Sequence, residues 1–273
     1  MPIYLADYTG GRKMTEEING TAVHYRILGE GKNKVLLLHG WGCDMSLMQP
    51  VADALAETHQ VLLIDFPGHG KSGRPPEPWG VAEYAGCLES LLKKLDFLPC
   101  SVVAHSFGCR IAARIAVDYP AFFSKIIFTG AAGIRPKPTK ESEKKSAQYQ
   151  RLKQIGNRFG RIPGMGKIAE SWQEKLRRKY GSSDYNALDS EMRRTFVKVI
   201  SEDLTGLYGQ IRQSTLLIWG DQDTDTPLWM GKEMEKRIPD AGLVIFEGGT
   251  HFAYLEQVQR FNTIALHFLK EEG

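Results

Sequence analysis

Residues 101–110 read SVVAHSFGCR, and this stretch decides the fold. The stretch 101–105, with Val-Val-Ala at its centre, predicts a buried strand, and Gly108 follows it close to where a helix over 111–117 must begin. A serine on such a strand-to-helix turn has its hydroxyl exposed above the carboxyl edge of the sheet. The usual pattern is G-x-S-x-G, and Ala104 replaces its first glycine. Ser106 is therefore a candidate nucleophile, and the competing interpretation is a serine that caps the helix.

The segments around this stretch alternate between two kinds of pattern. An Asn19-Gly20 pair between two extended runs predicts a β-hairpin over 15–28. Short aliphatic runs then alternate with helix-like segments, which predicts βαβ units and an α/β fold: a mostly parallel sheet with helices on both faces. The predicted strands are 34–38, 61–64, 101–105, 125–128, 215–219 and 242–246, and the predicted helices are 46–57, 81–95, 111–117, 228–237 and 258–270.

The alternation stops between residues 134 and 205. This segment consists of polar, helix-favouring stretches without an aliphatic strand run, and Pro136, Pro138 and the glycine-rich stretch 160–166 interrupt it. We therefore expect a helical cap, residues 134–205, inserted into a catalytic domain that is formed by residues 1–133 and 206–273. A chain of 273 residues is long enough to bury one large core of this kind without disulfides or metal.

The composition excludes several classes of protein. Hydrophobic residues make up 42% of the chain and charged residues 25%, unlike a disordered or fibrous protein. No apolar run approaches the roughly 20 residues of a membrane helix, and the first thirteen residues lack the pattern of a secretory signal. The four cysteines form no C-x-x-C pair. We therefore expect a cytoplasmic protein with no metal, no cofactor and no membrane or nucleic-acid partner.

Four further motifs follow the ends of predicted strands. Each lies just beyond the carboxyl end of its strand, which is the edge where open α/β sheets build their ligand sites. The same edge carries Ser106, so the motifs predict one shared site. They are HGWG at 39–42, DFPGHGKS at 65–72, GDQD at 220–223 and GGTH at 248–251.

On these motifs and their order, the chain resembles the α/β-hydrolase superfamily and, within it, the cap-bearing serine esterase-like branch. The resemblance extends over about residues 15–270. It implies a catalytic serine, acid and histidine in that order along the chain, which Ser106, Asp223 and His251 match. Asp221 is the alternative acid. The family equivalents of His39 and His105 are mostly structural, so we do not expect either to be the base.

The resemblance implies nucleophilic catalysis. A serine hydroxyl needs an imidazole to take its proton and a carboxylate to orient that imidazole. Ser106 would attack the acyl carbon, His251 would act as base and then acid, and Asp223 would orient His251. The backbone N–H groups of Trp41 and Phe107 would form the oxyanion hole. The predicted function is therefore hydrolysis of a carboxylic ester of a small molecule, with a thioester or a lactone as variants.

Two other functions use the same fold. Carbon–carbon bond hydrolases share the triad but commonly carry a tryptophan directly after the histidine, where this chain has Phe252. A non-catalytic ligand-sensing protein could also keep the triad. Haloalkane dehalogenases and epoxide hydrolases of this fold place an aspartate where Ser106 stands, so they are excluded.

Charge is distributed unevenly along the chain. Between residues 134 and 180 there are fourteen basic and four acidic residues, although the whole chain carries a net charge of only +3. One interpretation is a solvated outer face of the cap helices. The other is that the cap attracts an anionic substrate or carrier. The turn 39–42 also resembles that of the pimeloyl-carrier methyl esterases, which is in keeping with the second interpretation.

Overall fold

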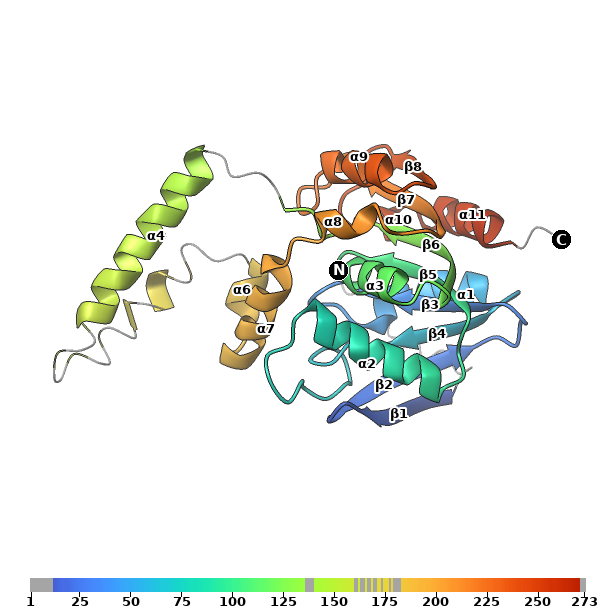
Figure 1. Cartoon of the computed structure of the whole chain (residues 1–273), viewed down its shortest axis with the longest axis horizontal. Helices are drawn as coiled ribbons and strands as arrows, with labels where there is room; N and C mark the ends of the chain where they lie inside the picture. The colour runs from blue at the N-terminus through green and yellow to red at the C-terminus, as the bar shows by residue number, and fades with distance from the viewer. Residues whose placement is uncertain are drawn as a thin grey trace. The chain divides into compact units, whose positions relative to one another are not determined.

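The computed structural model describes residues 12–135, 140–159 and 183–270, together with 162, 165, 168, 171, 172, 174–176 and 178. Within this part of the chain, eight strands form one sheet in the order β1-β2-β4-β3-β5-β6-β7-β8 (Figure 1). The strands from β4 to β8 in this order run parallel, and β2 pairs antiparallel with β1 and β4. The predicted, mostly parallel sheet is confirmed. The strands are β1 Arg12–Ile18, β2 Thr21–Leu28, β3 Lys34–Leu38, β4 Gln60–Ile64, β5 Cys100–His105, β6 Phe123–Thr129, β7 Ser214–Gly220 and β8 Ala241–Phe246.

The predicted hairpin joins β1 to β2. Asn19 and Gly20 adopt φ angles of 50° and 79°, which is the left-handed backbone that a two-residue hairpin turn requires. β1 and β2 pair in register from Ile18 opposite Thr21 outward. Local turn chemistry therefore fixes the register of this edge of the sheet.

Helices cover both faces of the sheet. α2 Val81–Lys94 and α3 Phe107–Asp118 pack on one face, where their apolar sides join a single core cluster with alternate residues of the strands. α1 Gln49–Leu55 and α11 Val258–Leu269 contact each other and pack on the other face. Since both faces are covered, the central strands are buried along nearly their whole length, as their unbroken aliphatic runs predict.

Several helix boundaries differ from the prediction. The expected helix 46–57 consists of a 3₁₀ turn, η1 Met45–Met48, followed by α1, because Pro50 favours the first turn of a new helix. α3 begins at Phe107, four residues earlier than predicted. Two short helices, α8 Thr205–Tyr208 and α10 Ala253–Glu256, were not predicted, since four residues are too few to show a helical period. α9 Leu228–Arg237 has the predicted bounds.

Contacts divide the chain into two compact units. The first comprises residues up to Ile134 and from Lys198 onward, and the second comprises Arg135–Val197. The predicted insertion extended to residue 205. Residues 198–204 instead belong to the sheet-based unit, because Val199 is buried in its core and the Arg110 guanidinium donates to the carbonyl oxygens of Val199 and Glu202.

The second unit is helical in the residues that the structure describes. Its described helices are α4 Lys140–Phe159, α6 Ser183–Ala187 and α7 Ser190–Ser201. The residues of α7 from Lys198 onward are assigned to the first unit. Asp189 caps the start of α7 by accepting from two backbone N–H groups, and Arg193 donates to the carbonyl oxygens of Tyr185 and Asn186 in α6. Pro136, Pro138 and the glycines of 160–166 lie outside the described residues. Of the helices described in the two units, none combines the length and apolar character needed to cross a membrane.

Candidate active site

Ser106 lies on a strained turn between β5 and α3. Its φ and ψ angles are 50° and −107°, a backbone conformation that non-glycine residues rarely adopt. The turn is held by hydrogen bonds from Ser106 N to Thr129 O at 3.1 Å and from Ala132 N to Ser106 O at 3.2 Å. The surrounding backbone thus fixes the geometry predicted for a nucleophile between a strand and a helix.

Small residues around the turn are needed because the backbone approaches closely. A Cβ atom on Gly108 would lie 2.8 Å from Leu38 O, and one on Gly40 would lie 2.9 Å from the His105 ring. Ala104 is different: it is fully buried in β5, in register with Leu38 and Phe128, and belongs to the core cluster. The departure from the G-x-S-x-G pattern is therefore accommodated in the core.

The structure brings together the three predicted side chains of the triad. His251 Nε2 lies 3.0 Å from Ser106 Oγ, and His251 Nδ1 lies 2.9 Å from Asp223 Oδ2. Ser106 follows β5, Asp223 lies in the turn after β7, and His251 follows β8, so three parallel strands deliver them to one edge. The side chain of Asp223 is inaccessible to solvent, and that of His251 is 12% exposed.

Both oxygens of Asp223 are held by donors. Oδ1 accepts from the backbone N–H groups of Asp225 and Thr226, at 2.9 and 2.8 Å. Oδ2 accepts from Thr226 Oγ1 at 2.8 Å as well as facing His251. Burial alone would raise the pKa of Asp223, but the hydrogen bonds from His251 and Thr226 outweigh burial and lower its pKa below 3.8. Asp223 is therefore ionised at neutral pH.

The alternative acids lie elsewhere. Asp221 is exposed, and its Oδ1 accepts from Gly248 N at 2.8 Å. This hydrogen bond joins the turn after β7 to the turn after β8. Asp225 is also exposed. Of the three aspartates in this turn, only Asp223 faces His251 at hydrogen-bond distance.

Thr226 is a site residue that the sequence analysis missed. It is buried, and its Oγ1 lies within hydrogen-bond distance of Asp223 Oδ2, Gly130 O and, at 3.2 Å, His251 Nδ1. Its position three residues after Asp223, next to the proline that precedes α9, was the available signal. Thr226 therefore links the acid, the base and the turn after β6.

Three other histidines surround the site as neutral groups. Burial lowers the pKa of His39 to about 4 and the pKa values of His69 and His105 to about 3. His39 Nε2 accepts from Phe66 N at 3.0 Å, and the ring of His105 packs 4.7 Å from that of His251. These contacts are structural, as the family resemblance implied for His39 and His105.

Trp41 and Phe107, the residues predicted for the oxyanion hole, lie next to each other, with ring centroids 5.2 Å apart. Phe107 is the first residue of α3, where a backbone N–H has no acceptor within the helix. The loop that carries Trp41 is anchored by buried Asp65, whose carboxylate accepts from Met45 N and Lys71 N. A Cβ atom on Gly70 would collide with that carboxylate, which explains the glycine in the motif 65–72.

No group of three or more His, Cys, Asp or Glu side chains in the described parts of the chain is arranged to hold a metal ion. Cys87, Cys100 and Cys109 are buried free thiols, and Cys43 is a half-buried one. Burial raises the pKa of the Cys87 and Cys100 thiols to about 12, so they stay protonated at neutral pH.

Comparison with known proteins gives similarity over most of the chain. A sequence model described as the alpha/beta hydrolase family matches residues 35–264. A curated 2-hydroxy-6-oxononadienedioate/2-hydroxy-6-oxononatrienedioate hydrolase from a Pseudomonas species is 27% identical, with 93% of each chain covered.

Solved structures are similar in fold. The enol-lactonase from Burkholderia xenovorans LB400 superposes with a TM-score of 0.72 at 20% identity, covering 94% of this chain and 100% of that one. The esterase EaEST from Exiguobacterium antarcticum gives a TM-score of 0.72 at 20% identity, covering 95% of this chain and 100% of the esterase. The matched proteins thus span several hydrolytic reactions on one architecture.

Proposed function

The chain belongs to the alpha/beta hydrolase family, and from this premise we propose that it is a serine hydrolase that cleaves a carboxylic ester of a small molecule. Thioesters and lactones are variants of the same acyl-transfer chemistry. The observation that carries the proposal is the continuous arrangement of Ser106 Oγ, His251 and Asp223, with separations of 3.0 and 2.9 Å.

The proposed reaction follows from this arrangement. As Ser106 Oγ attacks the acyl carbon, its proton passes to His251 Nε2, and ionised Asp223 stabilises the imidazolium. The tetrahedral intermediate collapses when Nε2 returns the proton to the leaving alcohol oxygen, which leaves an acyl-serine. Water then repeats the sequence: Nε2 takes one of its protons, the acid is released, and Ser106 recovers its hydrogen.

The oxyanion is the second requirement. We assign its stabilisation to the backbone N–H groups of Phe107 and Trp41, and removal of one such donor typically costs about 3–4 kcal/mol in the transition state. The N-terminus of α3 adds a partial positive charge at the same place, since Phe107 opens that helix. Only substitution by proline removes a backbone N–H, and it also fixes φ and deletes the aromatic ring of Trp41 or Phe107, so the test of the proposal rests on the triad.

The decisive experiment is pre-steady-state hydrolysis of p-nitrophenyl acetate and butyrate. We expect a burst of p-nitrophenol with an amplitude close to the enzyme concentration, and mass spectrometry should locate the acyl group on Ser106. In Ser106→Ala, burst and covalent adduct should both disappear while the melting temperature stays close to that of the parent. Sustained turnover by Ser106→Ala would overturn the nucleophile assignment, and binding without turnover by the parent would favour the ligand-sensing alternative.

Carbon–carbon bond hydrolysis is the second candidate, because a relative covering 93% of this chain is named as a hydrolase of 2-hydroxy-6-oxononadienedioate. In that reaction the leaving atom is carbon, and the same triad of Ser106, His251 and Asp223 would serve it, so the triad geometry does not separate the two candidates. Phe252 stands where such enzymes commonly carry tryptophan. Rates on a 2-hydroxy-6-oxo-dienoate and on p-nitrophenyl esters, compared as kcat/KM, separate the two candidates; a preference of a hundredfold or more for the dienoate would replace the ester proposal.

We further propose that the substrate is anionic. The support is the excess of ten positive charges between residues 134 and 180, of which Lys144, Arg151 and Lys153 of α4 are exposed. Such a field raises the local concentration of an anionic substrate and is screened by salt. We expect kcat/KM for a carboxylate-bearing ester to fall severalfold from low to high ionic strength, and that for its neutral methyl ester to stay constant. Equal responses of the two esters would refute an anionic preference.

A further inference from the structure

A second cavity lies at the opposite edge of the sheet from Ser106. It has a volume of about 310 Å³, within the size range of small-molecule pockets. The parallel strands β3, β5 and β6 begin there, and Ser101 near the start of β5 is separated from Ser106 by about 16 Å of extended strand. The cavity therefore cannot be part of the triad site. It is lined by Lys32, Asn33, Lys34, His59, Leu98, Pro99, Cys100, Ser101, Ser124, Lys125 and Leu269.

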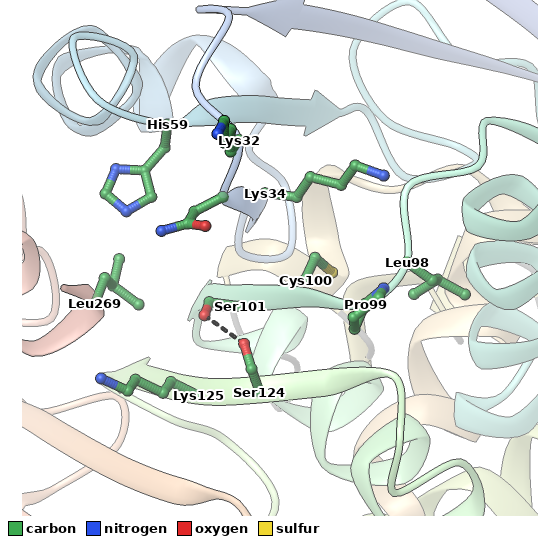
Figure 2. A pocket seen from close by; sticks show the side chains of 11 residues that line it. Lys32, Lys34, His59, Leu98, Pro99, Cys100, Ser101, Ser124, Lys125 and Leu269 are labelled. Atoms are coloured by element: carbon green, nitrogen blue, oxygen red, sulfur yellow. Dashed lines mark hydrogen bonds between the residues drawn. The ribbon is translucent and has the colours of Figure 1, made fainter. Parts of the chain in front are cut away.

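The lining is basic. It contains Lys32, Lys34 and Lys125 and, among its described residues, no aspartate or glutamate. Figure 2 shows Lys125 beside Ser124 on β6, with Lys32 and His59 across the cavity from them. Within the described chain, none of the three ammonium groups forms an ion pair with a carboxylate. The oxygens that Lys34 and Lys125 contact are neutral backbone carbonyl groups.

Backbone carbonyl groups hold two of the lysines in place. Lys34 Nζ donates to Asp96 O at 2.6 Å, just after α2, and lies 5.8 Å from the centre of the Phe97 ring. Lys125 Nζ donates to Phe268 O and Lys270 O, at 2.9 and 2.7 Å, where α11 ends. Each helix end contributes about half a negative charge. Even if both ends are counted in full, they offset about one of the three positive charges, so that at least about two remain among the described residues of the lining.

Hydrogen-bond donors also remain. An ammonium group has three N–H donors, of which Lys34 uses one and Lys125 uses two in these contacts. Ser101 Oγ and Ser124 Oγ lie 2.9 Å apart, and since one hydroxyl donates to the other, the second hydrogen of the pair is left for a ligand. Ser101 is itself more than nine-tenths buried. Three apolar side chains also line the cavity, Leu98 and Pro99 on one side and Leu269 on the other (Figure 2).

We propose that this cavity binds a small organic phosphate monoester. The dianion would match the two uncompensated charges, and its three terminal oxygens would accept from Lys32, Lys125 and the Ser101–Ser124 pair. The organic part would rest against Leu269, which lies on the same side of the cavity as Lys125 (Figure 2). A carboxylate carries one charge and fewer acceptor oxygens, so it is the weaker match. The site is independent of the proposed esterase reaction, because no residue of the triad contributes to it.

The test uses the full chain labelled with ¹⁵N and titrated with phenyl phosphate, inorganic phosphate and benzoate. We expect saturable shifts of the amide signals of Asn33, Ser101 and Ser124, with phenyl phosphate binding at least tenfold more tightly than benzoate. Shifts centred on Trp41 and Phe107 would place the ligand at the triad instead and overturn the site. Equal affinity for benzoate would overturn the phosphate assignment.

A matched pair of variants tests the role of charge. Lys32→Glu reverses an exposed charge at the cavity, and Lys232→Glu makes the same change on exposed Lys232 of α9, outside the lining. We expect calorimetry to show phenyl phosphate binding weakened at least tenfold in Lys32→Glu and by less than twofold in Lys232→Glu. An equal loss in both would mean that only net charge attracts the anion, which would refute a built site. Lys32→Gln serves as the milder variant if Lys32→Glu folds poorly.

Discussion

The two edges of the same parallel sheet are built in opposite ways. At the carboxyl edge, strain and buried neutral groups surround the triad: Ser106 adopts a φ of 50°, and His39 and His105 stay uncharged next to it. At the amino edge, the ammonium groups of Lys34 and Lys125 lie beside backbone carbonyl oxygens. The carboxyl edge is arranged to develop charge during a reaction, and the amino edge holds permanent charge.

The direction of the chain explains the difference. In a βαβ unit each helix begins near the carboxyl edge and ends near the amino edge, so positive helix ends gather at one edge and negative ends at the other. α3 begins directly after Ser106, where a partial positive charge stabilises an oxyanion. α2 and α11 end beside Lys34 and Lys125, where a cation is favoured. The direction of the helices therefore gives the two edges of the sheet opposite partial charges, whichever side chains line them.

The largest effect should come from the acid at the carboxyl edge. In Asp223→Asn the amide cannot hold His251 in the tautomer that accepts the proton of Ser106, so we expect kcat for a p-nitrophenyl ester to fall by on the order of 10³–10⁴. Asp221→Asn is the matched control, because Asp221 lies two residues away and its carboxylate accepts from Gly248 N, not from His251. A loss in Asp221→Asn as large as in Asp223→Asn would contradict the assignment of the acid.

Acid should destabilise the protein through the carboxyl edge. His39, His69 and His105 have pKa values of about 4, 3 and 3 when folded, below their ordinary 6.5, so between about pH 6.5 and 4 the unfolded chain binds protons that the folded chain does not. Their stabilising effect is complete above pH 6.5 and is lost as the pH falls. Each histidine adds a slope of up to about 1.4 kcal/mol per pH unit. The lowered pKa of Asp223 acts in the same direction, but only below pH 3.8.

Urea unfolding at a series of pH values measures this slope. We expect His105→Gln and His39→Gln each to reduce the slope of unfolding free energy against pH by up to about 1.4 kcal/mol per pH unit, which corresponds to one proton. His267→Gln, which changes an exposed histidine of α11, is the control and should leave the slope unchanged. An identical slope in all three variants would mean that the buried histidines are not the source of acid sensitivity.

The sequence predicted the candidate site at the carboxyl edge of the sheet but not the cavity at the amino edge. Ser106, Asp223 and His251 could be found because each follows a strand within a motif of glycines and small residues, and the order of the motifs is that of a known family. Thr226 was missed because its role depends on how the turn after β7 folds back on Asp223. The amino-edge cavity was missed because Lys34, Ser101 and Lys125 are far apart in sequence and share no motif. The pairing of β2 with β4 likewise has no local signal, since it joins residues that are far apart in the chain.

Thr226 should have a smaller effect than Asp223. Thr226→Val keeps the shape of the side chain but removes its single O–H donor, which lies within reach of both Asp223 Oδ2 and Gly130 O. The loss of a hydrogen bond of about 1.4 kcal/mol would lower kcat roughly tenfold. KM should change little, because Thr226 acts on the triad and not on the bound substrate. Thr226→Ser should recover most of kcat, and equal defects in the valine and serine variants would point to packing as the role of Thr226.

The smallest effect belongs to the amino edge and concerns stability. Lys125→Met keeps the aliphatic stem but removes the two hydrogen bonds that hold Phe268 O and Lys270 O at the end of α11. We expect the free energy of unfolding to fall by about 1 kcal/mol. Lys236→Met separates hydrogen bonding from the helix dipole, because Lys236 lies in the last turn of α9 and is exposed. If both variants lose the same stability in urea unfolding, the dipole alone accounts for Lys125. A larger loss in Lys125→Met would show that the amino edge needs a cation fixed by carbonyl groups.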